Sequence, residues 1–360
     1  YQDTGWWTKD ADKVHSAIYD SADMLRSSQT YVESRNRRSI ELYENLDVGD
    51  IDMWQHSTPV GRDGPYQYNI IESTVDTMQA EIIASRTKVQ FVTFGGTWES
   101  DKKAELMTLF MSGLFQELKV YDNISPEICL DALVFGTGFC KVVMGDDGRL
   151  LASRVPPWCI LHDDVADSGS SPMTLIEYRI VSRHSLMHKY KEDKAALSLI
   201  KDAPRFMFKS SGRRNNIADM VLILEGYSLY EDGRHVIATR NGTLVDEPWD
   251  SEFLPYIPLR YKSRRAGYLG KGVPEILEGQ QEIVNSLREK VNAQLMGASP
   301  FIWVPTGSQI RESQLSTEIW RVIESDKEPK HVAYNSVPSD LLMGLERESQ
   351  KATDIVGVNT

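Results

Sequence analysis

The stretch Tyr268–Pro305 constrains the fold most, because it combines a long helical pattern with clear start and stop signals. A glycine-rich turn leads into Pro274, and proline suits the first turn of a helix because the N–H that it lacks would be unpaired there. Apolar residues then recur at spacings of three and four as far as Leu295, which is typical of an amphipathic helix. Gly297 ends this pattern, and the run Phe301–Pro305 predicts a strand.

The predicted helix has three different faces when its residues are placed about 100° apart around the axis. Its apolar face is expected to pack on other helices and contains Ile276, Leu277, Ile283, Val284, Leu287, Val291 and Leu295. Its acidic face lies nearly opposite and contains Glu275, Glu278, Glu282 and Glu289. A polar band that includes Gln281 and Arg288 separates the two. This helix is therefore expected to bury one face and to hold the acidic face toward something else.

Composition places the chain among ordinary globular proteins. Its 360 residues suffice for two or three domains, and 41% are hydrophobic and 26% charged. No apolar run approaches the roughly 18 residues that a membrane span requires. The net charge of −12 argues against a protein that wraps nucleic acid with a basic surface, but it is compatible with one that lets nucleic acid pass without holding it.

The motifs of common catalytic sites are missing from the sequence. It contains no P-loop, dinucleotide fingerprint, nucleophile elbow, HExxH or kinase signature, and its three cysteines lack CxxC spacing. Gly136 and Gly138 follow a helical pattern instead of opening one, so they predict a helix end and not a phosphate loop. We expect no enzymatic activity, no cofactor and no metal. The alternative is a metal-dependent hydrolase that uses His162, Asp163 and Asp164.

The rest of the chain predicts an α+β fold. Residues 1–218 are expected to be mainly helical, with a hairpin formed by Phe139–Met144 and Leu150–Val155. Ser100–Lys119 predicts a helix whose Met and Phe stripe belongs to a core, and Val89–Phe94 is prone to form a strand. Residues 219–266 predict several short strands that form a small antiparallel, SH3-like domain.

A final helix is predicted over residues 338–356, with Leu342 and Leu345 on its apolar side. Near the start of the chain, Arg35, Arg37 and Arg38 form a basic patch. They either contact a partner or pair with Glu33 and Glu41 on a solvated helix face.

The order of these segments resembles the portal proteins, or head-to-tail connectors, of tailed bacteriophages, in a podovirus-like form. The resemblance rests on an ordered set of weak motifs and covers nearly the whole chain: RNRRSIELYENL, DALVFGTGFCKVV, RVPPWCILHDDVAD, EPWDSEFLPYIPLRY, GYLGKGVPEILEGQQEIVNSLREKVNAQLMGASPFIWVP and ERESQKATDIVGVNT. It implies a wing at residues 1–266 and a first stem helix at 267–299. A small α/β clip would follow at 300–337 and a second stem helix at 338–356. The tunnel-loop region would start at residues 357–360, and the tunnel loop and crown themselves would lie beyond this sequence.

The resemblance also implies a function. Such proteins form a ring, usually of twelve subunits, at one vertex of the capsid in the virion, after assembly in the cytoplasm of the bacterial host. Double-stranded DNA is packaged and later ejected through the ring, which docks the terminase large subunit and then tail or adaptor proteins. Major capsid and scaffolding proteins are further expected partners, and no membrane is involved.

The implied roles fall on three sets of residues in this sequence. The stem residues Glu275, Glu278, Gln281, Glu282, Arg288 and Glu289 would line the DNA channel, although the glutamates could instead form an ordinary solvated outer face. The apolar stem residues, including Leu342 and Leu345, would pack between subunits. Terminase or adaptor contacts would come from the clip residues Arg311, Glu312, Glu318, Trp320, Arg321, Lys327 and Lys330. A structural head–tail adaptor that never contacts DNA is a further alternative.

Overall fold

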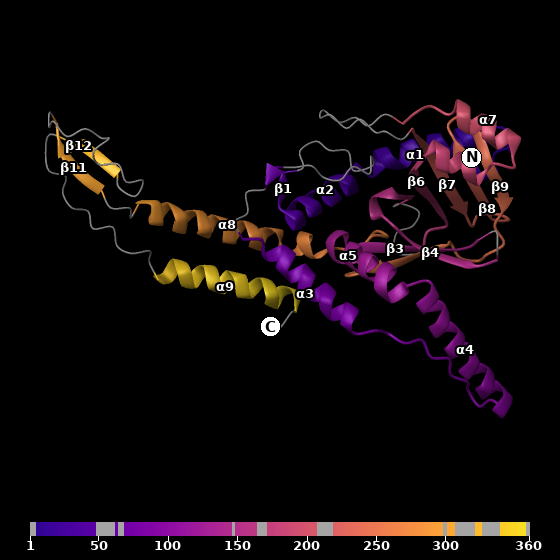
Figure 1. Cartoon of the computed structure of the whole chain (residues 1–360), viewed down its shortest axis with the longest axis horizontal. Coiled ribbons are helices and arrows are strands. Elements are labelled where there is room, and N and C mark those ends of the chain that lie inside the picture. Colours follow the sequence, from indigo (N-terminus) through magenta and orange to yellow (C-terminus); the bar gives the residue numbers. More distant parts are fainter. Residues whose placement is uncertain are drawn as a thin grey trace. The chain divides into compact units, whose positions relative to one another are not determined.

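The computed structural model describes residues 5–47, 62–63, 68–145, 148–163, 171–206, 219–297, 301–306, 321–325 and 339–357. The chain divides into two compact units. Unit 1 comprises Tyr1–Pro65 and Ile71–Ile276, and unit 2 comprises Tyr66–Ile70 and Leu277–Thr360. Helices and mainly antiparallel sheets make up the described parts, which confirms the predicted α+β class (Figure 1).

A five-stranded antiparallel sheet lies at the centre of unit 1. Its strands are adjacent in chain order: β5 (Ile160–His162), β6 (Thr174–Ser182), β7 (Met220–Ser228), β8 (Arg234–Thr239) and β9 (Gly242–Pro248). Because side chains alternate along a strand, Ile176, Tyr178 and Leu224 share one face. They form a core there with buried residues of helix α1 (Val14–Ser28).

A second, three-stranded sheet of unit 1 has the order β10–β3–β4. Strands β3 (Thr137–Met144) and β4 (Leu150–Val155) pair antiparallel, which confirms the predicted hairpin. Strand β10 (Tyr256–Arg260) pairs with β3 from far along the chain. The strands expected to form a separate SH3-like domain are therefore shared between two sheets. Hairpin signals identify neighbouring strands, but they contain no information on the long-range partner of β10.

Helices complete unit 1. They are α2 (Thr30–Glu44), α3 (Ile70–Ala84, whose first residue belongs to unit 2), α4 (Trp98–Glu117), α5 (Ser125–Phe135), α6 (Arg183–Lys189) and α7 (Lys194–Asp202). Short elements lie between them: 3-10 turns at Trp6–Thr8 and Pro157–Cys159, a π-helical turn at Val120–Ile124, and the two-residue strands β1 (Leu46–Asp47) and β2 (Arg62–Asp63). On α2, Arg37 and Arg38 lie 3.7 and 3.5 Å from Glu33 and Glu41, as the solvated-face interpretation predicts.

Two predictions for residues 89–118 are wrong. Val89–Phe94 is extended but pairs with no strand among the described residues. The helix predicted at Ser100–Lys119 exists as α4, yet it contains no buried residue, so its Met and Phe stripe does not belong to the core of this chain. Periodicity identifies an apolar face, but it does not identify the molecule that covers that face.

Unit 2 contains most of the long helix α8 (Val273–Gly297), whose first turn belongs to unit 1. After it come β11 (Phe301–Pro305), β12 (Arg321–Ser325) and the helix α9 (Ser339–Val356). The predicted strand at Phe301–Pro305 is confirmed, and it pairs with β12 in parallel. The helix predicted at 311–320 lies outside the described residues. Within the part of the chain that the structure describes, no helix is both long and apolar enough to cross a bilayer.

Candidate functional site

The predicted stem helix α8 buries a face that differs from the predicted one. Leu277, Val284 and Val291 are buried, as expected of its apolar face, but they are already covered within the single chain. Ile283 and Leu295 remain 47% and 55% exposed. The buried face is therefore rotated toward the polar band of the helix.

Gln281 explains this rotation. Its side chain is only 1% exposed. It accepts a hydrogen bond from the Ile70 N–H at 2.9 Å and donates to the Tyr68 carbonyl oxygen at 2.8 Å. Arg288 lies 4.9 Å from the centre of the Tyr68 ring. The prediction that Gln281 lines a channel is wrong, because a polar side chain with buried partners belongs to the interior of unit 2.

Helix α9 lies beside α8 in unit 2. Gln280 of α8 donates to the Glu348 carbonyl oxygen of α9 at 3.1 Å and also to its carboxylate. Ala352 is fully buried and Leu345 half-buried, whereas Leu342 is 49% exposed. The pair thus leaves apolar side chains of both helices uncovered, namely Ile283, Leu295, Leu342, Met343 and Ile355.

The glutamates of the acidic face of α8 differ in how far they are exposed. Glu275 belongs to unit 1 and forms an ion pair with Arg264. Glu278 is half-buried, and Glu282 and Glu289 are exposed. The expected acidic surface is therefore present at the last two glutamates, on the side of the helix away from the buried Leu277 and Val284.

The strands β11 and β12 lie within residues 300–337, the segment that the resemblance assigns to the clip. Their register joins Phe301 to Arg321 and Pro305 to Ser325. Of the predicted clip contacts, Arg321 lies in β12. The others, which are Arg311, Glu312, Glu318, Trp320, Lys327 and Lys330, lie outside the described residues.

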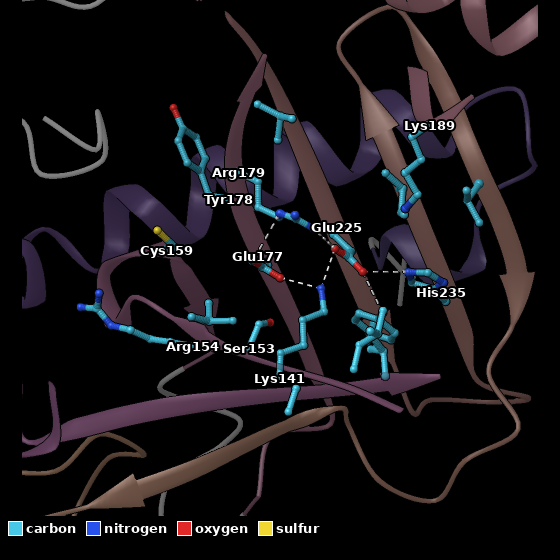
Figure 2. A pocket seen from close by; sticks show the side chains of 18 of the residues that line it. Lys141, Ser153, Arg154, Cys159, Glu177, Tyr178, Arg179, Lys189, Glu225 and His235 are labelled. Atoms are coloured by element: carbon cyan, nitrogen blue, oxygen red, sulfur yellow. Dashed lines mark hydrogen bonds and ion pairs between the residues drawn. The ribbon is translucent and has the colours of Figure 1, made fainter. Parts of the chain in front are cut away.

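A cavity of about 1030 Å³ lies between the two sheets of unit 1. Figure 2 shows Lys141 of β3 reaching between Glu177 of β6 and Glu225 of β7. The Lys141 ammonium lies 2.7 Å from the Glu177 carboxylate and 2.6 Å from that of Glu225. These three side chains are each less than 10% exposed, so three charges lie together away from solvent.

Both carboxylates of this cluster have several polar partners. Glu225 also accepts from Arg179 at 3.0 Å, from Tyr227 at 2.8 Å and from His235 at 3.2 Å. Glu177 accepts from Tyr256 at 2.7 Å and lies 3.6 Å from Arg179. Burial by itself raises the pKa of Glu225, but the hydrogen bonds from His235, Lys141 and Tyr227 outweigh it and lower that pKa.

A buried cluster of this kind suits a structural role, because its charges are paired with one another across the two sheets. It joins β3 and β10 of one sheet to β6, β7 and β8 of the other. The sequence analysis missed it because Lys141, Glu177, Glu225 and His235 lie far apart along the chain. A usable signal was present, since each of the first three is a charged residue flanked by apolar residues in its strand.

A second ion pair, with a buried carboxylate and a half-buried guanidinium, anchors α5. Arg154 of β4 donates two hydrogen bonds of 2.6 Å to the Asp131 carboxylate. Burial raises the pKa of Asp131 to about 6, although the Arg154 guanidinium opposes that shift. This pair holds α5 against the three-stranded sheet.

Of the three residues of the hydrolase alternative, the structure describes His162 and Asp163. His162 is fully buried in β5, with its ring centre 5.0 Å from that of Tyr268. Asp164 lies outside the described residues. No group of three His, Cys, Asp or Glu side chains within the described ranges is arranged to hold a metal ion. A buried histidine of this kind is out of reach of a nucleic-acid substrate.

No protein-family model matches the chain. A comparison with curated proteins found no similar sequence.

Proposed function

We propose that this chain is the subunit of a viral portal ring through which double-stranded DNA is packaged and ejected. The observation that carries the proposal is the order of elements in unit 2. A long helix, a small strand pair and a return helix follow the large α+β unit, and Gln280 joins the two helices at Glu348. This is the order wing, stem, clip and stem that the resemblance implies.

The uncovered apolar residues of the helix pair support assembly. Ile283 and Leu295 of α8, with Leu342 and Met343 of α9, are between 47% and 66% exposed. Apolar side chains gathered on two adjacent helices favour burial against another molecule. In a closed ring, each copy covers these residues on its neighbour by the same contact, repeated around the axis.

The acidic end of α8 supports a channel. Exposed Glu282 and Glu289 lie on the same face of the helix, and a ring would repeat them once in every subunit. Carboxylates repel phosphates, and they offer none of the counterion release by which lysine and arginine bind DNA. DNA would therefore slide past this surface without adhering to it.

The clip end would dock the other components. The terminase large subunit would bind there during packaging, and tail or adaptor proteins would follow. Capsid and scaffolding proteins would contact the wing. In this proposal the ring performs no catalysis, and the energy for DNA movement comes from the motor that docks on it.

DNA packaging into shells that contain the assembled chain and a terminase motor tests this function. Changing Glu282 and Glu289 together to Lys is expected to slow packaging, most strongly at low salt, because the introduced cations would hold phosphates. The matched control changes Lys290 and Lys351 to Gln, which alters surface charge without adding a cation. Packaging that proceeds equally fast with the lysine variant would contradict the channel role. A ring that binds no terminase would support a structural adaptor instead.

A further inference from the structure

Helix α4 is the most exposed apolar element of unit 1. Leu106, Met107 and Phe110 are 57%, 52% and 63% exposed, and no residue of the helix is buried. The segment that precedes it continues this surface, since Phe94 is fully exposed and Trp98 is 77% exposed. Figure 1 shows α4 extending away from the sheets of unit 1.

The apolar face of α4 has the spacing of a helix–helix seam. Leu106, Phe110 and Gly113 are exposed and follow one another at intervals of four and three. This alternation brings one residue in every turn to the same side, and it suits a second helix crossing at about 20°. Leu109 borders the seam, and Phe110 would add an aromatic contact.

Among the described residues, segment 88–93 lies against the opposite face of α4. The Phe91 N–H donates to the Thr108 hydroxyl at 3.1 Å, and the Thr93 hydroxyl bonds to Asp101. Thr108 and Asp101 lie on the polar side of the helix, away from Leu106 and Phe110. The extended segment 88–93 therefore occupies the polar side and leaves the apolar seam open.

Contacts at both ends of this arm fix it to unit 1. Gln79 of α3 donates to the Pro126 carbonyl oxygen at 3.0 Å, and the Tyr121 hydroxyl donates to the Thr87 carbonyl oxygen. Beyond the arm, α5 is almost entirely buried, including Ile128 and Leu133. The arm is thus held between two anchored helices.

The size of this surface favours a permanent contact. The exposed apolar side chains between Ile82 and Phe110 present on the order of 1000 Å² if each large side chain offers roughly 100 Å². A typical monomer exposes an apolar patch of roughly 300–600 Å² at most. Interfaces that are both large and apolar are characteristic of subunits that do not exist apart.

From these observations we infer that α4, with segment 88–98, is an arm that packs helix-on-helix against a second copy of this chain. The inference rests on the proposed ring, which supplies that copy on one side of every subunit. Each subunit would extend one arm and receive one, in a contact that closes around the ring. The arm would thus join neighbouring wings independently of the stem helices.

The test compares the full-length wild type with the double variant Leu106→Glu and Phe110→Glu. Both side chains are exposed in the single chain, so circular dichroism and the Tm of the monomer should stay unchanged. The variant should need at least a tenfold higher concentration for half-assembly in sedimentation experiments, because two charges would be buried at the seam. Ser112→Glu, an exposed residue on the same side of α4 as Thr108, is the control and should assemble as the wild type does.

Hydrogen exchange provides a second measurement. Amides of residues 98–117 should exchange at least tenfold more slowly in the assembled wild type than in the dissociated chain. If the wild type assembles and the double variant assembles equally well, the arm contact is refuted but the ring is not. A wild type that stays monomeric would overturn the ring itself. Exchange at 98–117 that slows only when a different protein is added would assign the arm to that protein and overturn the inference.

Discussion

Gly136 and Gly270 lie backbone against backbone, at the point where helix α5 ends and the chain turns toward α8. Gly136 has a φ of 88°, and a Cβ there would lie 2.6 Å from the backbone of Gly270. A Cβ at Gly270 would in turn collide with the Gly136 carbonyl oxygen. Since the Gly270 N–H also donates to the Thr137 hydroxyl at 2.7 Å, this contact fixes the start of α8 on unit 1.

Gly270→Ala should therefore lower the free energy of unfolding, by about 1–3 kcal/mol, because the backbone must move to admit a methyl group. Urea titration followed by circular dichroism measures the change. Gly279→Ala in the middle of α8 is the control, since a Cβ there meets nothing within 4 Å. The control should be neutral or stabilising by up to roughly 1 kcal/mol. Equal effects of the two substitutions would refute the close contact.

Lys141→Met should destabilise unit 1 by about 3–5 kcal/mol, because it leaves the buried carboxylates of Glu177 and Glu225 without their shared cation. Thermal unfolding measures the loss. Lys189→Met, a surface lysine near the same cavity, removes the same charge and should cost less than about 0.5 kcal/mol. A Lys141 variant as stable as the Lys189 variant would show that the cluster contributes little to stability.

The lowered pKa of Glu225 predicts an acid-sensitive fold. Above the ordinary value of 4.5, the carboxylate is charged in both states, and the cluster contributes its full stabilisation. As the pH falls below 4.5, the unfolded chain takes up a proton that the folded chain does not, so the free energy of unfolding decreases. The slope should approach about 1.4 kcal/mol per pH unit for this group.

Unfolding at pH 7, 5, 4 and 3 measures that slope in the wild type and in Glu225→Gln. The variant should be less stable at pH 7 and should lose less stability between pH 5 and 3. Glu252→Gln, an exposed glutamate, should follow the wild-type profile. A Glu225 variant with the full wild-type slope would contradict the assignment.

Substitutions at two neighbouring residues of α8, one buried and one exposed, should have different effects on folding and on assembly. Val284 is fully buried, whereas Ile283 is 47% exposed. Val284→Asp should unfold or strongly destabilise the chain, because it buries an unpaired charge. Ile283→Asp should leave the Tm of the monomer within a few degrees but prevent assembly. Light scattering and thermal unfolding distinguish the two, and normal assembly of Ile283→Asp would place that residue outside the subunit contact.

Periodicity in the sequence predicted most of the local structure. It located α4, α5, α8 and α9, the hairpin β3–β4, and the helix end at Gly136. These features depend on residues within a few positions of one another, where apolar spacing and glycine or proline signals are decisive.

The errors concern partners that are distant in the sequence. Gln281 is buried because Tyr68 and Ile70 satisfy its amide, and nothing near Gln281 in the sequence indicates them. Strand β10 pairs with β3 instead of with its neighbours β8 and β9. The apolar face of α4 was assigned to the core because spacing alone does not distinguish burial within a chain from burial between chains.

The mass and shape of the purified wild-type chain test the central claim most directly. Light scattering combined with negative-stain electron microscopy should show a ring with an axial opening and a mass of roughly half a megadalton, as expected for about twelve copies of a 40.8 kDa chain. A monodisperse species of 40.8 kDa at micromolar concentration, with no ring in the images, would contradict the portal proposal.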